Sequence, residues 1–476
     1  MNWKTIAKSL KNKDMQKRLL VLLGLIVAYR FLAHIPVPLA DPTQLKEVIN
    51  SVLGGSQFGG FLNLLSGGAL ASFSIVLVGL SPFITASIIT QLLTKAVPKL
   101  EELHKDGESG RRKIQQWTRI ISLPLAIVQS IAFIYILRQT VLQSNSTILS
   151  DPTIFEWIVA VGAMTAGSML LMWLGEIMTE QGVGNGLSLL IFAGIISQMP
   201  QFGQLFIGSL FGTSTSPVTD PLNVFGWFTI PISTGAFFVF LVLGLVSLMV
   251  LYFLVKINEA QRVVTINYAK RVQGNSSYGG VKSILPMKLI AAGVIPVIFA
   301  VAFLSLPAFV GQVLKATGSE AYADIATNLI TWFQTPNPGQ FTGETWQAFI
   351  YPGLYFVLVI AFTYFYTGIV FNSNEIAENL QKQGGFIEGV RPGLQTEKYL
   401  SRTMNRLILF GSLVLGLIAV LPYIGEYLLY NLVGFQDTNG NLAIGGTGVL
   451  IVVSVALEAL RQINSRALMV TYDDYK

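Results

Sequence analysis

The chain has 476 residues, of which 52% are hydrophobic and only 12% are charged. This composition is typical of a protein that crosses a membrane several times, and it excludes an ordinary soluble domain. The chain has no cysteine, which excludes disulfides, thiolate nucleophiles and Cys-ligated metals, and its two histidines are too few for a His-built metal site. The net charge is +6, and in a membrane protein the positions of the cations along the chain are more informative than their sum.

Windows of about 20 apolar residues predict ten membrane-spanning helices, so we expect an all-α polytopic membrane protein. In chain order the spans lie at residues 19–35, 73–94, 120–138, 153–174, 187–206, 234–255, 289–310, 350–371, 407–424 and 447–465. The first span is expected to be retained rather than removed as a signal peptide, because no small-x-small cleavage site follows it and Arg30 interrupts its end.

Lysine and arginine concentrate in alternate connections. Of the 31 cations, 27 lie in segments 1–18, 95–119, 256–288 and 372–406 and from Arg461 onward. The opposite set of connections, which comprises 36–72, 139–152, 207–233, 311–349 and 425–446, holds only Lys46 and Lys315. Because cytoplasmic loops carry the excess of positive charge, both termini are predicted to be cytoplasmic.

Ten helices divide into five and five, and an odd number in each half turns the second half upside down relative to the first. We therefore expect an N-terminal half at 1–206, an outer connection at 207–233 and a C-terminal half at 234–476. Inverted halves place the functional path at their interface, near the middle of the membrane. No residue-level repeat supports the division, which comes from the helix count alone.

Two glycine-containing segments interrupt this pattern. Residues 59–74, GGFLNLLSGGALASFS, precede the second span and are too short to cross a bilayer. Gly67 and Gly68 would form a bendable junction, each costing about 1 kcal/mol relative to alanine in a helix. Residues 182–188, GVGNGLS, join spans four and five without a cation, so the connection is tight and Asn185 or Ser188 is expected to cap the next helix.

Two aliphatic pairs lie near the starts of spans two and five. Leu80 with Ile84, and Leu187 with Ile191, are four residues apart, so each pair shares one face of a helix. Such faces pack against other helices, contact lipid or line a pore, and the residues alone leave these alternatives open. No chain of acidic residues crosses the middle of the spans, which argues against an ion-coupled transporter.

The basic connections 256–288 and 372–406 are long and rich in polar residues. They either rest on anionic lipid, at about 1 kcal/mol per cation, or dock on a large partner. The second connection mixes Glu375, Glu378, Glu388 and Glu397 with its cations and contains an Arg-Pro-Gly turn at 391–393. This mixture favours a folded docking loop over a simple basic tether.

Six long segments together resemble the SecY family of bacterial protein-conducting channels, related to Sec61-alpha. They are GGFLNLLSGGALASFSIVLVGLSPFITASIITQLL, GEIMTEQGVGNGLSLLIFAGI, QRVVTINYAKRVQG, LPMKLIAAGVIPVIFA, NEIAENLQKQGGFIEGVRPGLQTEKYL and GGTGVLIVVSVALE. They occur in the order expected for the family, from the first span to the tenth. The chain departs from the family mainly in the outer connections 207–233 and 311–349, which look longer than the family norm.

The resemblance implies an hourglass pore between the halves, with three kinds of site. An aliphatic ring at the waist falls on Leu80, Ile84, Leu187, Ile191, Ile295 and Ile451, although Ile298 on the other side of Pro296 is an alternative to Ile295. A plug at about 60–72 falls on Phe61, Leu62, Asn63, Leu64, Leu65, Ser66, Gly67, Gly68, Ala69 and Leu70. A lateral gate between helices two and three and helices seven and eight falls on Thr85, Ser87, Gln91 and Phe299.

The resemblance also implies the partners and the location. The basic loops look like the platform for the SecA ATPase and the ribosome, with Lys270, Arg271 and Arg391 as the expected contacts, and small SecE- and SecG-like subunits are expected in the membrane. The expected function is a translocase channel for unfolded preproteins and membrane-protein clients in the bacterial plasma membrane, without a cofactor. The chain itself has no P-loop and no catalytic triad, so it is not expected to be an enzyme. The alternative from another class is a ten-span secondary transporter of a small solute.

Overall fold

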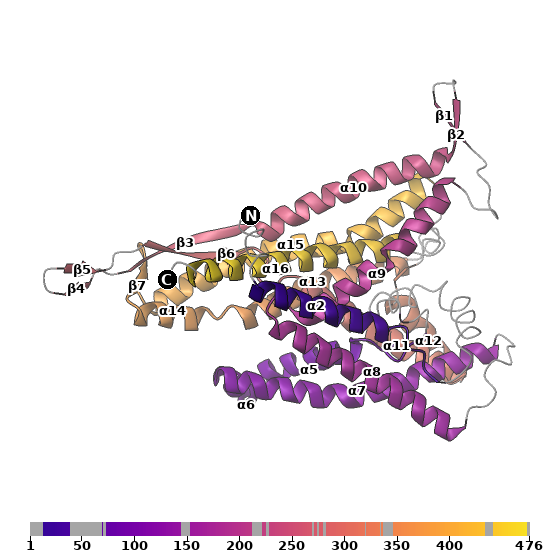
Figure 1. Ribbon diagram of the computed structural model, residues 1–476, viewed down its shortest axis with the longest axis horizontal. Helices are drawn as coiled ribbons and strands as arrows, with labels where there is room; N and C mark the ends of the chain where they lie inside the picture. The colour runs from indigo at the N-terminus through magenta and orange to yellow at the C-terminus, as the bar shows by residue number, and fades with distance from the viewer. Residues whose placement is uncertain are drawn as a thin grey trace. The chain divides into compact units, whose positions relative to one another are not determined.

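The computed structural model is dominated by helices (Figure 1). It describes residues 13–38, 69, 73–143, 153–211, 221–224, 228–268, 271–273, 276–278, 282–318, 320–333, 335–336, 346–433 and 441–473. Most of the glycine-rich segment at 59–74 therefore lies outside the described residues. The contacts between Cα atoms divide the chain into two compact units, each of which is described by itself below.

A helix overlaps each of the ten predicted spans. These helices are α2 (Lys13–Leu32), α5 (Ser81–Ala96), α7 (Glu108–Gln143), α8 (Ile154–Glu180), α9 (Gly186–Phe211), α10 (Thr234–Glu259), α11 (Ile295–Ala316), α13 (Ile350–Val370), α15 (Leu394–Val433) and α16 (Asn441–Asp473). Within the described residues, six segments are long and apolar enough to cross a membrane, and Gly186–Pro200 is a shorter apolar helix. The predicted all-α membrane fold is confirmed.

The second span begins later than predicted, and this is a correction. The apolar window starts at residue 73, but the helix starts at Ser81, and residues 73–80 form a series of turns. Gly79 has a φ of 63°, which is the left-handed conformation, so the preceding residues cannot continue into the helix. Pro82 then occupies the first turn, where its missing N–H is not needed. Hydropathy does not separate buried turns from a buried helix.

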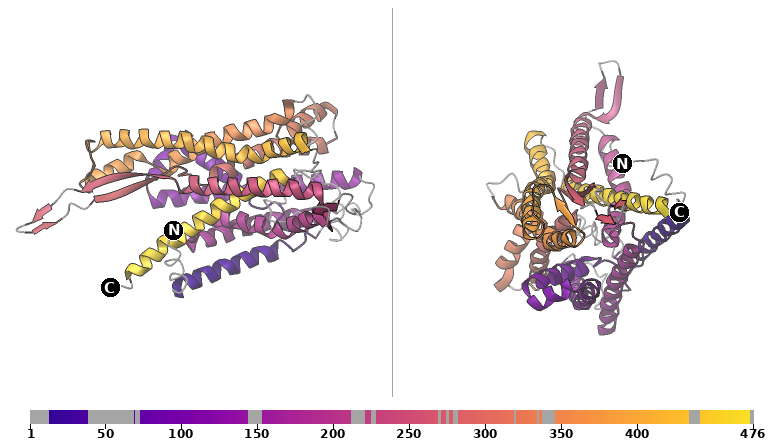
Figure 2. Two further views of the ribbon diagram at one scale, coloured as in Figure 1. Left: turned by 90° about the horizontal axis from the view of Figure 1, so that it is seen from above. Right: turned by 90° about the vertical axis from the view of Figure 1, so that its left-hand side faces the viewer.

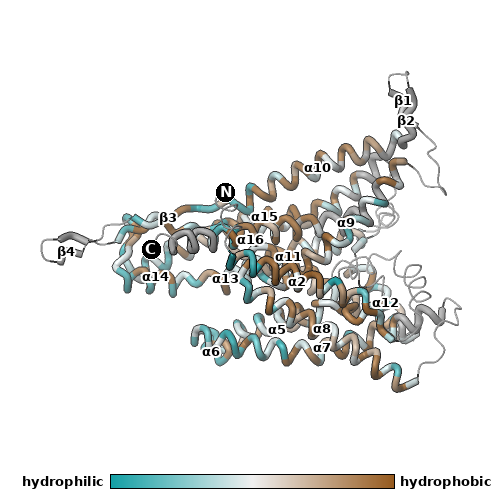
Figure 3. Tube along the Cα trace, viewed as in Figure 1, coloured by the Kyte–Doolittle hydropathy of each residue, from teal (hydrophilic) through white to brown (hydrophobic). Residues whose placement is uncertain are grey.

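The polar connections are more ordered than hydropathy alone indicates. The segment 95–119 contains α6 (Pro98–Lys105) and the first turns of α7, and the segment 372–406 contains α14 (Ser373–Lys382), β7 (Gly385–Ile387) and the first turns of α15. In Figure 3, α6 and α14 are mostly hydrophilic, whereas α10 is mostly hydrophobic. Short helices and long helical extensions therefore make up much of the basic segments.

The outer connections also contain regular structure. Strands β1 (Pro221–Val224) and β2 (Phe228–Ser233) form an antiparallel hairpin that leads directly into α10. The connection 311–349 contains α12 (Glu320–Phe333) and the short 3-10 helix η2 (Trp346–Phe349), which contact each other. The two outer connections are therefore partly folded.

The first unit comprises Met1–Ser247, Val301–Pro352 and Pro422–Lys476. In it α5 packs on α7, α7 on α8, α8 on α9, and α9 on α16, while α2 contacts α8 and α9. Figure 1 shows α5, α7 and α8 side by side. Helix α8 is among the most deeply buried elements, with Met164, Leu171 and Met178 at 0%, 1% and 0% exposure.

The second unit comprises Leu248–Ala300 and Gly353–Leu421. Its sheet has the order β6-β3-β7, in which β3 (Gln261–Tyr268) pairs antiparallel with β6 (Lys282–Lys288) and with β7. A separate hairpin of β4 (Arg271–Gln273) and β5 (Ser276–Tyr278) lies beyond the far ends of β3 and β6 (Figures 1 and 2). The basic connection 256–288 is thus a long β extension. The division by contacts does not test the predicted inverted halves, which stay a prediction.

Two glycines of α8 provide a test of how tightly this helix is packed. A Cβ at Gly167 would overlap the backbone carbonyl of Ile75, whereas a Cβ at Gly162 would meet nothing within 4 Å. We expect Gly167→Ala to destabilise the protein by about 1–3 kcal/mol or more, because backbone cannot move aside as a side-chain tip can. Gly162→Ala should leave stability unchanged or raise it by up to about 1 kcal/mol, because alanine favours a helix.

The measurement is the thermal unfolding midpoint of each purified variant in the same detergent. The packing described for α8 would be contradicted if the two substitutions shifted the midpoint in the same direction and by the same amount.

Candidate functional site

The first aliphatic pair lies at the beginning of α5. Leu80 is the N-cap residue and Ile84 lies in the first turn, where its N–H donates to the carbonyl oxygen of Leu80 at 2.9 Å. Both side chains are buried, at 4% exposure each. The position of this turn is fixed from outside the helix, because the Ser168 hydroxyl of α8 donates to the carbonyl oxygen of Gly79 at 2.8 Å.

The second aliphatic pair lies at the beginning of α9. The Asn185 side-chain oxygen accepts from the N–H groups of Leu187 and Ser188 at 3.1 and 3.5 Å, which confirms the predicted cap. Leu187 is half-buried and Ile191 is 3% exposed. The Thr179 hydroxyl at the end of α8 accepts from the Gly186 N–H at 2.9 Å, so the turn into α9 is tied back to α8.

One face of α8 supports both pairs. Ser168 holds the turn before α5, and Gly175, seven residues later, lies under Leu187, whose Cδ2 would be 2.9 Å from a Cβ at that glycine. Residues seven apart share a helix face and lie about 10 Å apart along the axis. The first turns of α5 and α9 are therefore both held against the same side of α8.

The other two ring positions lie on α16 and α11. Ile451 is 5% exposed, and its helix α16 packs on α9 within the first unit. Ile295 is the first residue of α11 and is half-buried, while the alternative Ile298 is 7% exposed, and both lie in the second unit. Five of the six residues thus lie in one unit, and the ring as a whole stays a prediction.

The predicted gate residues on α5 carry unusual polar groups. Thr85 is 4% exposed, and its hydroxyl has no hydrogen-bond partner among the described residues. The Gln91 side-chain nitrogen donates to the Ser87 hydroxyl at 3.1 Å, but its oxygen is buried without a partner in the described part of the chain. Buried polar groups are normally paired, so these positions are exceptions.

Gln129 on α7 is a polar candidate that was not among the predicted site residues. This side chain is 7% exposed and its oxygen has no partner within the described residues, although α5 and α7 pack together. The available signal was a glutamine inside the otherwise apolar run SLPLAIVQSIAFIY. An intramembrane polar side chain of this kind is a candidate functional residue by default.

Phe299, the gate residue predicted on α11, belongs to an aromatic cluster of the second unit. Its ring packs edge-on against Phe362 and Tyr366 of α13, with both centroid distances at 6.1 Å. Such pairs stabilise a contact by about 0.5–1.5 kcal/mol beyond burial. α11 and α13 are thereby joined near the start of α11.

Of the predicted plug, only Ala69 is described, and the other nine residues, Phe61 to Gly68 and Leu70, lie outside the described part of the chain. Ala69 is fully buried, and its carbonyl oxygen accepts from the Ser74 N–H at 3.1 Å. Ser74 in turn forms an isolated antiparallel bridge with Pro36. The end of the plug segment is thus held next to the residues that follow α2.

The basic connections of the second unit share one hydrophobic core. It is built by side chains from β3, β6, β7 and the first half of α15, which are Val264, Met287, Ile387, Leu400, Met404 and Ile408. Leu400 is fully buried, and Met287 is 1% exposed. We call these four elements together with α14 the platform. The platform is a folded surface rather than a loose basic loop.

Arg391 lies at a sharp turn of the platform. It is exposed, and it is flanked by Gly389 and Gly393, whose φ values of 78° and 93° favour glycine. Its carbonyl oxygen accepts from the Thr396 hydroxyl at 3.0 Å, which fixes the turn against the start of α15.

The other two predicted contacts lie near the β4–β5 hairpin. Arg271 is the first residue of β4, and its side chain is not described; Lys270 lies outside the described residues.

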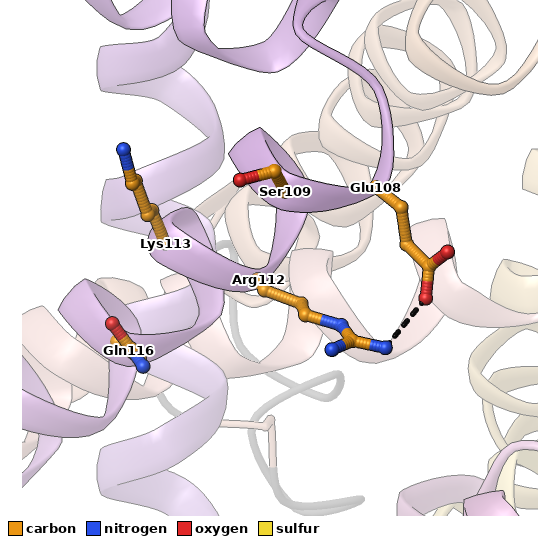
Figure 4. A pocket seen from close by; sticks show the side chains of 5 residues that line it. All are labelled: Glu108, Ser109, Arg112, Lys113 and Gln116. Atoms are coloured by element: carbon orange, nitrogen blue, oxygen red, sulfur yellow. Dashed lines mark hydrogen bonds and ion pairs between the residues drawn. The ribbon is translucent and has the colours of Figure 1, made fainter.

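The cations of α6 and α7 form no comparable site. Figure 4 shows a hollow lined by five residues of α7 alone, where Arg112 pairs with Glu108 at 2.7 Å. Both side chains are strongly exposed, and such pairs contribute little. The pKa of the nearby His104 is lowered by partial burial and then by Arg111 and Lys95. This region is a solvated cationic surface.

One ion pair joins two of the packed helices. Arg119 of α7 donates to Glu176 of α8 at 2.7 Å, and the Glu176 side chain is 18% exposed. The described residues contain no group of three His, Cys, Asp or Glu side chains that could hold a metal ion. Within the described residues, the notable features are therefore buried aliphatic positions, buried polar groups without a partner, and a folded basic platform.

Comparison with known proteins gives one family. A sequence model described as SecY matches residues 74–460. The protein translocase subunit SecY of Corynebacterium glutamicum is 39% identical over 473 residues, covering 98% of this chain and 98% of that protein.

Two solved structures have a similar fold. One is described as "The plug domain of the SecY protein stablizes the closed state of the translocation channel and maintains a membrane seal", with a TM-score of 0.55, 19% identity and coverage of 93% of this chain and 90% of that one. The other is Sec61 in the canine ribosome–channel complex from the endoplasmic reticulum, with a TM-score of 0.52, 18% identity and the same coverage. At these identities the likeness concerns the fold.

Proposed function

The chain belongs to the SecY family, and we propose that it forms the channel through which unfolded preproteins cross the bacterial plasma membrane. It is a multi-pass membrane protein and a translocase subunit rather than an enzyme. The observation that carries the proposal is the relation to a protein translocase subunit along 98% of both chains. Membership of this family does not favour the alternative of a secondary transporter for a small solute.

We propose that the waist of the channel is the aliphatic ring of Leu80, Ile84, Leu187, Ile191, Ile295 and Ile451. Branched aliphatic side chains offer water no hydrogen bonds, so a narrow ring of them dewets and resists ions, while the side chains can still move around a passing peptide. The placement of two ring pairs in the first turns of α5 and α9, both held by α8, supports the proposal.

Residues 61–70 are proposed to be a plug that closes the outer side of the ring. The relative whose description names a plug domain and a membrane seal supports this by analogy of fold. The buried Ala69 supports a docked end of the segment.

Deletion of residues 61–70 tests the plug. The channel should still assemble, because the segment lies outside the predicted spans, but its resting ion conductance in planar bilayers should rise severalfold. Conductance as low as that of the parent would assign the segment to packing. Gly162→Ala, which fills open space on α8, serves as the control that should not change conductance.

The lateral gate is proposed to have two sides. One side is formed by α5 and α7, which are the predicted helices two and three, and the other by α11 and α13, which are the predicted helices seven and eight. A hydrophobic client segment would leave sideways into lipid through this seam. Thr85, Ser87, Gln91 and Phe299 are the proposed gate residues, and Gln129 is added to them. The side-chain oxygens of Thr85, Gln91 and Gln129 are buried without a partner among the described residues, and they support a seam of lowered packing stability, since each such group costs about 1–3 kcal/mol.

An engineered disulfide tests the gate. Because the chain has no cysteine, Thr85→Cys with Phe299→Cys gives a single possible internal pair. If the seam is closed at rest, oxidation should cross-link them, since a disulfide needs Cα atoms within about 7 Å. The locked channel should neither insert membrane proteins nor secrete preproteins, and reductant should restore both activities.

A second pair, Thr85→Cys with Phe303→Cys, moves one turn along α11 and controls for the helical phase near Pro296. The gate assignment fails if neither pair cross-links, or if a fully cross-linked channel inserts clients at the parental rate.

The platform is proposed to be cytoplasmic and to bind the SecA motor and the ribosome, with both chain termini on the same side. The solved relative in a ribosome–channel complex supports the ribosome by analogy. Lys270, Arg271 and Arg391 are the proposed contacts. Small SecE- and SecG-like subunits would complete the membrane complex, and ATP hydrolysis would belong to SecA.

Arg391→Glu tests the motor contact. It should leave the platform folded, because the side chain is exposed, but reduce SecA-driven transport into proteoliposomes about tenfold or more, which corresponds to a loss of about 1.4 kcal/mol. Lys398→Glu makes the same charge change at another exposed position of the platform and should have a smaller effect. Equal losses of transport in the two variants would indicate that SecA responds to the overall charge of the platform rather than to the turn at Arg391. Unchanged transport in Arg391→Glu would show that Arg391 does not contact SecA.

A further inference from the structure

Helix α12 and the 3-10 helix η2 carry an exposed apolar surface that the channel proposal does not use. The exposed large side chains are Tyr322 at 50%, Ile325 at 53% and Trp332 at 37% on α12, with Trp346 at 67% and Phe349 at 52% on η2. The two elements contact each other within the first unit. Five large apolar side chains exposed on two elements that contact each other are typical of a surface with an apolar neighbour.

The apolar side chains of α12 cover a wider part of the helix surface than the part that packs on α11. Successive residues are about 100° apart around a helix. One edge of the arc packs on α11, where Gly311 brings the helices so close that a Cβ would be 3.0 Å from atoms of Leu329 and Ile330. The other edge contains Ile325 and Trp332 and stays exposed, and Tyr322 in the first turn is exposed as well. Asp324, Thr327 and Asn328 belong to the polar side of the helix, and they are exposed too.

The position of α12 is tied to the end of a membrane span. α11 is one of the segments apolar enough to cross a membrane, and it exposes Phe303 and Val310, seven residues apart on one face. Gly318, with a φ of 67°, ends α11, and only three residues connect α11 to α12. Three residues reach no farther than about 14 Å, so α12 starts beside the end of α11. η2 leads directly into α13, which belongs to another such span.

We propose that α12 and η2 lie in the membrane interface, with Tyr322, Ile325, Trp332, Trp346 and Phe349 buried at the boundary between lipid headgroups and acyl chains. This boundary is the layer where aromatic side chains are enriched and where amphipathic helices lie flat. Both elements adjoin the ends of spans in the chain, which favours lipid over another protein as their neighbour. The helix thereby anchors the end of α11 that is opposite Ile295.

The chemistry of the contact is apolar rather than electrostatic. Between Lys315 and Lys382 the sequence contains no lysine or arginine, and α12 carries Glu320 and Asp324. Lys315 lies in the last turn of α11, but α12 and η2 themselves carry no lysine or arginine, so we expect them to bind the interface through apolar area rather than through charge. Contact with zwitterionic lipid should be as close as contact with anionic lipid, and salt should not weaken it.

A matched pair of single-cysteine variants tests the proposal. Ile325→Cys and Thr327→Cys are about 160° apart around α12, both parent side chains are exposed, and the chain has no other cysteine. Each full-length variant is labelled with an environment-sensitive fluorophore and reconstituted in phosphatidylcholine vesicles with and without lipids brominated near the headgroup. The label at 325 should emit at shorter wavelength, be quenched by brominated lipid about twofold or more, and resist iodide, while the label at 327 should show the reverse.

Equal iodide access at both positions would overturn the proposal, because α12 would then face water. A label at 325 that resists iodide but is not quenched by brominated lipid would also overturn it, because a protein would then cover the patch. Loss of quenching in high salt, or quenching only when anionic lipid is added, would contradict the apolar mode of contact.

Discussion

Close packing of neighbouring segments against one face of α8 is the constraint on which the proposed channel waist depends. Gly167 lets α8 touch the chain at Ile75, Ser168 bonds to the carbonyl of Gly79, and Gly175 makes room for Leu187. Small residues allow such approaches in membrane proteins, where apolar side chains gain little from leaving lipid for protein. The first turns of α5 and α9 start from this one surface. Their aliphatic side chains are therefore placed by α8 and not by their own helices alone.

This arrangement meets two demands that oppose each other. A resting channel must exclude water and ions, whereas a working channel must let a polar backbone pass through a region where unpaired backbone groups are costly. Aliphatic side chains on rigid first turns satisfy the first demand. The oxygens of Thr85, Gln91 and Gln129, which are buried without a partner in the described part of the chain, lie on α5 and α7, where a seam that opens has to be less stable than an ordinary helix contact. In our proposal, the rigid first turns that carry the aliphatic ring and the less stable helix contact of the gate thus lie on neighbouring elements.

The sequence predicted the features that depend on local pattern. Hydropathy placed a helix at each of ten windows, and the Asn185 cap followed from a short polar link between two apolar runs. The start of α5 was wrong, because the left-handed Gly79 and the turns before it are as apolar as the helix. The platform core was not foreseen, since Val264, Met287 and Leu400 meet only when separate segments fold together. Gln129 was overlooked because one polar residue does not change a window average.

The most direct test of the central claim is whether a translocating chain touches the proposed ring. Cysteines are introduced singly at Ile84, Ile191 and Ile451 of this cysteine-free chain, and a preprotein with one cysteine is stalled during transport. Ile89→Cys is the matched control, because Ile89 lies on the same helix as Ile84 but is 37% exposed. The account predicts disulfide cross-links to the stalled chain at 84, 191 and 451 and not at 89. Cross-links at 89 as strong as those at 84, or none at the three ring positions, would contradict it.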